Sequence, residues 1–201
     1  MARHRTSRSE ERPQRLFVAV AIPRQVAKPV EAAVEPWRAA FPNARWIPQA
    51  NWHVTLQFLG PVYPRLVPWV RERLGEVAVT TAPFDTRVHG LGAFPSARRA
   101  RVLWAGLDGA EGRLEELATA VQRVLAPELP LETRPFAGHL TIARSDQPIE
   151  APEGYARSQL ESERFTVGSF VLMRTHIERP SPFYEPLEVF LLQGGAGTSS
   201  P

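Results

Sequence analysis

Short apolar runs separated by Gly- and Pro-containing turns recur along the chain and predict β-strands. The runs are rich in β-branched and aromatic residues, the composition typical of strands. We expect strands at residues 15–22, 51–59, 84–91, 101–107, 140–143, 165–174 and 185–192.

Three other segments space their apolar residues at the period of a helix, three or four positions apart. The first begins at Val26 and reaches Phe41, and its two prolines, Pro29 and Pro36, predict a late start and a kink. The other two helices are expected at residues 65–74 and 111–125.

The order of these elements suggests an internal duplication. A strand and a helix precede residue 53, and a second strand and helix precede residue 139. We therefore expect an α+β fold with two related lobes, in which two antiparallel sheets face a central cleft and the helices lie outside. A single bilobal domain should span residues 15–192, between disordered tails at residues 1–14 and 193–201.

The chain contains no cysteine, which excludes disulfides, thiolate nucleophiles and cysteine-based zinc sites. A reducing cytoplasmic location is the simplest interpretation. The apolar run at residues 16–22 is far shorter than the roughly 20 residues of a membrane span, so we expect no membrane association. The charged segment before it lacks the apolar stretch of a signal peptide.

The formal charge of +3 comes from one end of the chain. Residues 1–15 hold five of the 24 basic and two of the 21 acidic residues, which leaves 19 of each in the remainder. The body is therefore neutral, and its charge gives no support for a long nucleic-acid footprint.

Two segments repeat the same chemical pattern, a histidine two residues before a threonine within an apolar run. His53 and Thr55 form the first pair, and His139 and Thr141 form the second, 86 residues later in both positions. In a strand, residues two apart share one face at about 6.6 Å, so each segment should present an imidazole and a hydroxyl together. The duplication predicts two half-sites that face one ligand.

These side chains meet the requirements for hydrolysis of a cyclic phosphodiester. The reaction needs a base for the attacking water, an acid for the departing oxygen, and donors for the phosphoryl oxygens. Histidine serves both proton roles because its ordinary pKa is about 6.5. A single such histidine would most simply be structural, but two in matching apolar settings favour catalysis. No carboxylate or third histidine has ligand-like spacing, so we expect no metal and no cofactor.

The flanking residues make the pattern more specific. The chain resembles the two-histidine (2H) phosphoesterases, and among them the bacterial and archaeal RNA 2′,3′-cyclic phosphodiesterases, also called 2′-5′ RNA ligases. The similar blocks lie at residues 15–20, 46, 51–60, 102–107, 134–144 and 184–187. They span nearly everything between residues 15 and 192.

The resemblance implies a duplicated 2H phosphoesterase fold and an RNA processing hydrolase with His53, Thr55, His139 and Thr141 as its catalytic quartet. It implies His139 as the base and His53 as the acid on the leaving 3′ oxygen, which yields a 2′-phosphate. Arg144 matches a phosphate-binding arginine, and its forked donors suit that task.

Two further residues are candidates for substrate binding by the same resemblance. Phe17 lies where an aromatic ring would stack on a base, although a core position in the first strand is an equal alternative. Arg134 would either contact RNA or hold the second histidine strand in place.

One position departs from the family pattern, because Gly138 stands where proline usually precedes the second histidine. The catalytic atoms are unaffected, but we expect the approach to His139 to be more flexible.

Three functions remain open at this point. The first is metal-independent hydrolysis of RNA terminal 2′,3′-cyclic phosphates, with reversible 2′-5′ ligation as a related activity, by a monomer whose partners are RNA ends such as tRNA fragments. The second keeps the site but acts on a small cyclic nucleotide or an ADP-ribose cyclic phosphate. The third is a non-catalytic RNA-binding module, supported by the basic tail.

Overall fold

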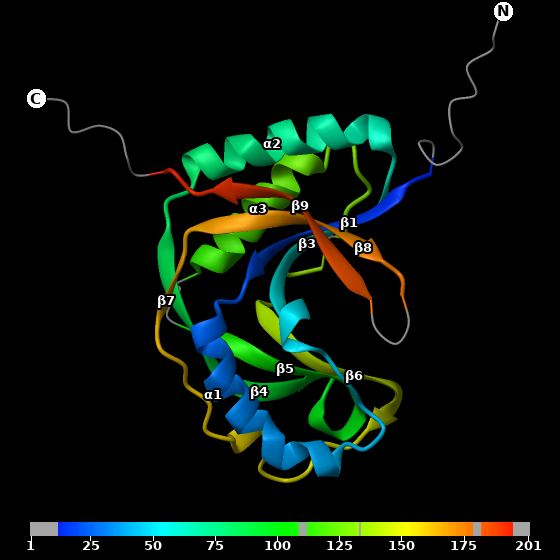
Figure 1. Cartoon of the computed structure of the whole chain (residues 1–201), viewed down its shortest axis with the longest axis vertical. Helices are drawn as coiled ribbons and strands as arrows, with labels where there is room; N and C mark the ends of the chain where they lie inside the picture. Colours follow the sequence, from blue (N-terminus) through cyan, green and yellow to red (C-terminus); the bar gives the residue numbers. More distant parts are fainter. Residues whose placement is uncertain (1–11, 109–111, 133, 179–181, 195–201) are drawn as a thin grey trace, which may run out of the picture.

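The computed structural model describes residues 12–108, 112–132, 134–178 and 182–194, and shows a curled sheet with helices packed on it (Figure 1). The strands are β1 (Gln14–Ala21), β2 (Arg45–Trp46), β3 (His53–Val62), β4 (Phe84–Phe94), β5 (Ala100–Asp108), β6 (His139–Ile149), β7 (Phe165–Val167), β8 (Ser169–His176) and β9 (Phe183–Leu191). The helices are α1 (Arg24–Val34), α2 (Val67–Thr80) and α3 (Arg113–Leu125).

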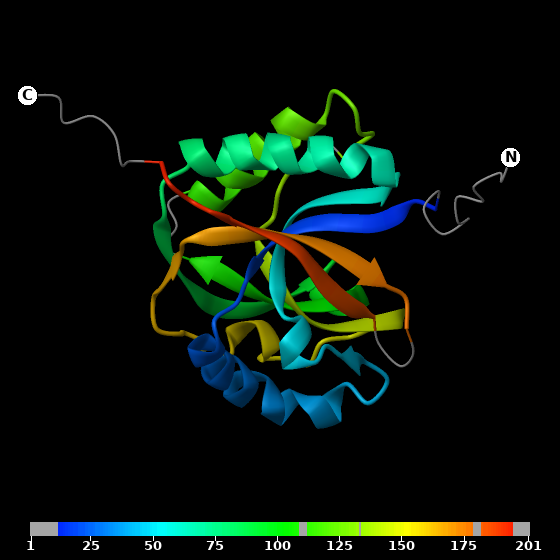
Figure 2. The ribbon, with the colours of Figure 1, turned by 45° about the horizontal axis from the view of Figure 1, so that its top comes forward.

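The strands are connected in the order β7-β4-β5-β6-β3-β1-β8-β9, with β2 paired to β6, and every recorded pairing is antiparallel. The predicted α+β class is confirmed. The two halves meet where β3 and β6 pair through Val54 and Leu140, so the expected two sheets are joined into one strongly curved sheet (Figure 2).

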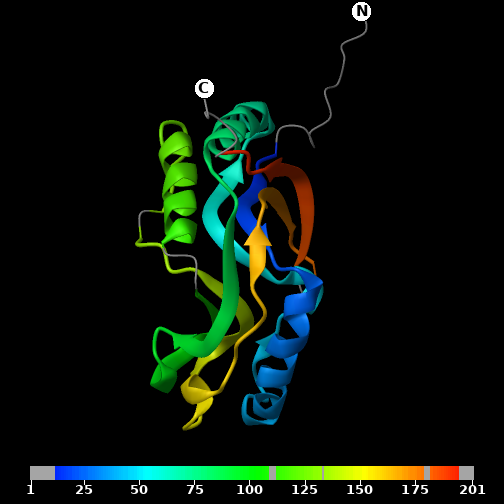
Figure 3. The same ribbon diagram turned by 90° about the vertical axis from the view of Figure 1, so that its left-hand side faces the viewer.

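The helices are exchanged between the halves. Helix α1 follows β1 in sequence but packs near β4, whereas α3 follows β5 and packs against β3 and α2. Helix α2 in turn lies along β9. Figures 1 and 3 show α2 and α3 together at one end of the molecule and α1 at the other. Each half is therefore covered by a helix that belongs in sequence to the other.

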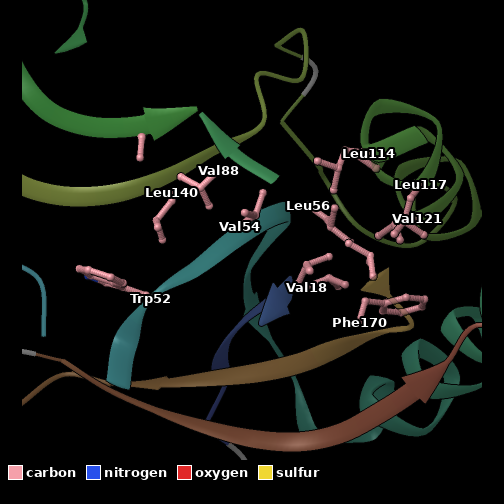
Figure 4. Close-up of a cluster of buried hydrophobic side chains, with 14 of the residues drawn as sticks. Val18, Trp52, Val54, Leu56, Val88, Leu114, Leu117, Val121, Leu140 and Phe170 are labelled. Carbon is pink, nitrogen blue, oxygen red and sulfur yellow. The ribbon is translucent and has the colours of Figure 1, made fainter. Parts of the chain in front are cut away.

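One hydrophobic cluster extends through both halves and holds the histidine strands from behind. Val54 and Leu140 are fully buried and lie beside Val88 (Figure 4). Further along the cluster, Leu56 points toward the buried face of α3 (Figure 4). That face contains Leu114, Leu117 and Val121, as the helical spacing in the sequence predicts. The apolar pattern thus fixes which face of each histidine strand is turned inward.

Several element boundaries differ from expectation. The late start predicted from Pro29 is wrong, because the helix begins at Arg24 and contains Pro29 in its interior. It ends at Val34 and continues as a 3₁₀ turn over Glu35–Ala40, which agrees with the kink predicted at Pro36. Helix α2 continues past residue 74 to Thr80 because Val77 and Ala78 bury a further turn. The strand expected at 165–174 divides into β7 and β8, and the two-residue strand β2 was not predicted.

Most of the two expected tails lies outside the described residues. Where the chain is described, Gln14 already belongs to β1. At the other end, the backbone N–H groups of Gln193 and Gly194 donate to the carbonyl oxygens of Ala78 and Thr81. Within the described ranges, no helix is both long and apolar enough to cross a bilayer.

Candidate active site

The pairing of β3 with β6 brings the two histidine motifs together. Antiparallel pairing of Val54 with Leu140 sets His53 across from Thr141 and Thr55 across from His139. Val54 and Leu140 are fully buried, whereas these four polar side chains are half-buried on the opposite face. The predicted alternation of faces is confirmed, and the two motifs are related by an approximate two-fold axis through the Val54–Leu140 pair.

Both imidazoles are oriented by the backbone in the same way. Nδ1 of His53 lies 2.7 Å from the carbonyl oxygen of Asn51, and Nδ1 of His139 lies 2.6 Å from the carbonyl oxygen of Ala137. A carbonyl oxygen only accepts, so in each ring Nδ1–H donates and Nε2 is left to exchange protons. The acceptor is two residues before the histidine in both motifs.

The segment that orients His53 is itself tied to the β8–β9 hairpin. The side-chain amide of Asn51 donates to the carbonyl oxygen of Pro182 at 2.9 Å. Asn51 therefore connects the backbone acceptor of His53 with the start of β9.

Aromatic rings pack against both histidines. The His53 ring centre is 4.9 Å from that of Phe17 and 5.1 Å from that of Tyr184, and the His139 ring centre is 5.1 Å from that of Phe94. Phe17 is only 2% exposed, so its contacts support the His53 imidazole. Base stacking by Phe17 stays a prediction, and Phe58, which is 53% exposed nearby, offers a more accessible ring.

The surroundings lower the pKa of both imidazoles. Burial is the main cause of the lowered pKa of His53, and the charges of Arg144 and His139 lower it further, against the hydrogen bond to Asn51. Burial and then Arg144 lower the pKa of His139, opposed by the hydrogen bond to Ala137. Burial raises the pKa of Tyr184, while Arg144 opposes that shift. Arg144 therefore lies within electrostatic reach of all three groups.

Two cavities open from the quartet. The smaller, of about 320 Å³, contains His53 and Thr141 in its wall, together with Phe17 and Tyr184. The larger, of about 700 Å³, contains Thr55 and His139. Arg144 and Phe58 border both cavities, so they mark the boundary between them.

The two candidate arginines occupy different positions. Arg144 is exposed on β6 and has no carboxylate within ion-pair distance among the described residues. Its forked donors are thus available to an anion above the quartet. Arg134 borders the larger cavity, is 80% exposed and pairs with Glu132. Its recorded partner is not on the histidine strand.

Within the described part of the chain, no group of three His, Asp or Glu side chains is arranged to hold a metal ion. The other two described histidines lie outside the quartet. His89 is exposed on β4 and borders neither of the two cavities. His176 contacts Glu185, with its Nε2 2.6 Å from the carboxylate.

Three residues that contact the quartet are not predicted as site residues by the sequence pattern. Asn51 and Tyr184 occur in the family-like blocks, but no pattern indicated that they meet at His53. Phe94 lies at the end of β4, beyond the predicted strand, and only pairing through β5 brings it to His139.

Comparisons with known proteins agree with this arrangement. Residues 23–178 match the family model of the 2′-5′ RNA ligase superfamily. The chain is 34% identical to the RNA 2′,3′-cyclic phosphodiesterase of Thermus thermophilus, over 91% of this chain and 92% of that one. It is 33% identical to the protein of that name from Geobacillus stearothermophilus, over 89% of this chain, and the match spans 57% of that longer relative.

Solved structures show the same likeness. A crystal structure of a Thermus thermophilus protein superposes with a TM-score of 0.75 at 32% identity, covering 90% of this chain and 99% of that one. Escherichia coli LigT in complex with NADP⁺ superposes with a TM-score of 0.71 at 25% identity, covering 90% and 99%.

Proposed function

Because the chain belongs to the 2′-5′ RNA ligase superfamily, we propose that it hydrolyses the 2′,3′-cyclic phosphate at the end of an RNA to a 2′-phosphomonoester. One observation carries this proposal beyond the family resemblance. The Val54–Leu140 pairing places two imidazoles and two hydroxyls around one point, with an uncompensated arginine beside them.

In the proposed mechanism, the phosphorus lies above the Val54–Leu140 pair. His139 Nε2 takes a proton from water, whose oxygen attacks phosphorus from the side of the larger cavity. The P–O3′ bond breaks as His53 Nε2 gives its proton to the leaving oxygen. This in-line arrangement needs the two proton carriers on opposite sides of phosphorus, and the diagonal placement of the histidines provides it.

The remaining groups stabilise charge on the phosphoryl oxygens. Thr55 and Thr141 donate from opposite sides, because each faces the histidine of the other strand. Arg144 offers two parallel donors to a non-bridging oxygen pair. The terminal nucleoside occupies the smaller cavity, where Tyr184 and Phe58 supply ring surface for the base.

We assign the substrate to RNA ends, tRNA fragments among them, and expect the protein to act as a cytoplasmic monomer without metal or cofactor. The neutral body of the chain suits a substrate recognised mainly at its end. Competition between a short RNA and a cyclic mononucleotide tests this choice, since preference for the mononucleotide would favour a small-molecule substrate.

The central experiment is product analysis in EDTA with an RNA oligonucleotide that ends in a 2′,3′-cyclic phosphate. The native protein should yield a 2′-phosphate, and His53→Ala and His139→Ala should each lower kcat by about 10²- to 10⁴-fold. His89→Ala is the matched control, because His89 is exposed and borders neither cavity. Unchanged turnover in both quartet variants, with native circular dichroism, would reject the proposal.

A further inference from the structure

The smaller cavity carries positive charge without a compensating acid. Two arginines, Arg144 on β6 and Arg15 on β1, border it, and no aspartate or glutamate of the described residues lines it. Its volume of about 320 Å³ is near the lower end of the range of about 300–1,000 Å³ typical of small-molecule sites, which suits a single nucleotide. A ligand that matches both arginines carries two anionic groups.

The two arginines reach the cavity from different strands. The sheet order β6-β3-β1 places Arg144 and Arg15 on either side of the strand that contains His53. At one end of β1, Ala21 pairs with His53. Toward the other end, Arg15 pairs with Pro61 near the end of β3. Arg15 therefore lies at the end of the pairing that is remote from the quartet.

Arg15 is on the same face of the sheet as a ring that contacts the quartet. Phe17 is two residues from Arg15 on β1, so the two side chains share one face about 6.6 Å apart. The Phe17 ring centre is 4.9 Å from that of His53. Arg15 thus extends the wall of the cavity one step further away from the reacting phosphorus.

Thr175 places a hydroxyl next to this guanidinium. It pairs with Arg15 on one side and with Tyr184 on the other, and it borders the same cavity. Arg15 is exposed and has no ion-pair partner among the described residues. Glu185, which follows Tyr184, is engaged by His176. A guanidinium and a hydroxyl side by side are typical donors to a phosphate group.

We propose that Arg15 and Thr175 bind the phosphate on O5′ of the nucleoside whose cyclic phosphate lies at the quartet. The inference rests on the proposed hydrolytic function and adds a determinant of its specificity. In RNA this group is the phosphodiester to the preceding nucleotide, and in a free nucleotide it is a monoester. The cyclic phosphate and the O5′ phosphate are then the two anions that match Arg144 and Arg15.

The test compares three substrates that share adenosine 2′,3′-cyclic phosphate and differ only at O5′. The first has a free hydroxyl, the second a phosphate monoester, and the third a phosphodiester to a second nucleoside. Initial rates in EDTA give kcat/KM for each. The native protein should prefer the phosphorylated substrates about tenfold, because they gain a charge-assisted contact. A gain with both assigns the contact to an RNA chain, and a gain with the monoester alone assigns it to a free nucleotide.

Arg15→Gln should reduce this preference to nearly one, because it removes the charge and the forked donors that face the phosphate. Thr175→Val should reduce it about threefold, since it removes one neutral donor at nearly constant shape. Arg24→Gln is the matched control and should keep the native preference, because Arg24 is exposed at the start of α1 and borders neither cavity. The preference is a ratio measured on one protein sample, so a partly unfolded variant does not alter it.

Two results would overturn the inference while leaving the hydrolytic function intact. The first is an equal kcat/KM of the native protein for the hydroxyl and the phosphorylated substrates. The second is a native preference that persists in Arg15→Gln. Hydrolysis of none of the three substrates would instead reject the proposed function itself.

Discussion

The carbonyl oxygen of Asn51 lies 2.7 Å from Nδ1 of His53, so the backbone of one residue sets the orientation of the other's imidazole. The same Asn51 is held through its side chain by the carbonyl oxygen of Pro182. The β8–β9 hairpin is therefore linked, through Asn51, to the orientation of the His53 imidazole on β3.

Replacing Asn51 with alanine should disturb this geometry without removing any reacting group. The variant loses the hydrogen bond from the Asn51 side chain to Pro182, which contributes about 1 kcal/mol. If the activation free energy rises by that amount, kcat falls about fivefold. KM should change less, since no substrate contact is removed. The exposed Gln25→Ala on α1 is the control. A native kcat in Asn51→Ala would show that the hairpin contact does not position His53.

Removing the charge of Arg144 should affect both binding and proton transfer. Arg144→Gln should lower kcat/KM about 100-fold, by loss of a phosphoryl donor. It should also raise the pKa of His53 and His139, because the Arg144 charge lowers both. Compared with Arg144→Gln, Arg144→Lys should bring the pKa values of His53 and His139 back close to those of the native protein, because the positive charge is kept. It should recover less of kcat/KM, since an ammonium lacks the two parallel donors of a guanidinium. NMR titration of the two imidazoles separates these effects, with Arg157→Gln, exposed and remote, as the control.

The lowered histidine pKa values also predict how stability depends on pH. Folded His53 and His139 bind protons less readily than in the unfolded chain, whose histidines have a pKa near 6.5. Their contribution to stability is therefore present above about pH 6.5 and is lost as the pH falls toward the folded-state pKa values. Urea unfolding at pH 7.5 and at lower pH should show this loss, and a His53→Gln, His139→Gln double variant should show less of it. Equal losses in both proteins would contradict the assignment.

A substitution in the buried Val54–Leu140 pair should lower both the free energy of unfolding and the activity. Leu140→Ala removes a fully buried side chain at the contact between β3 and β6, and should cost about 3 kcal/mol of unfolding free energy. Residual activity should fall as well, because the pair sets the register of both motifs. Leu191→Ala, at a side chain that is 64% exposed, should cost far less. Similar losses of stability in the two variants would argue against this role.

Gly138 and Phe136 should be coupled. Gly138→Ala brings a Cβ atom to 3.2 Å from the Phe136 ring, next to the Ala137 carbonyl that orients His139. We expect a lower kcat in Gly138→Ala and a partial recovery when Phe136→Ala is added. A double-mutant cycle on kcat measures the coupling, and purely additive effects would show that the two residues act independently.

The sequence pattern predicts the face of each strand on which the quartet side chains lie, but it does not predict which strands are neighbours. Alternation within residues 53–56 and 139–142 assigns His and Thr to one face, because that periodicity is local. The pairing of Val54 with Leu140 joins residues far apart in the chain and has no local signal. The looser approach to His139 at Gly138 stays a prediction. The packing of the Phe136 ring against Gly138 has no signal in the sequence pattern.

The exchange of helices has a consequence for folding. Since α1 packs on the half that follows it and α3 on the half that precedes it, the helical covering of each half is completed only when the other half is also made. The quartet, which takes one motif from each half, can assemble only at the end of that process. Catalytic turnover is therefore a direct assay of complete folding, and a chain that is only half folded should be inert rather than partly active.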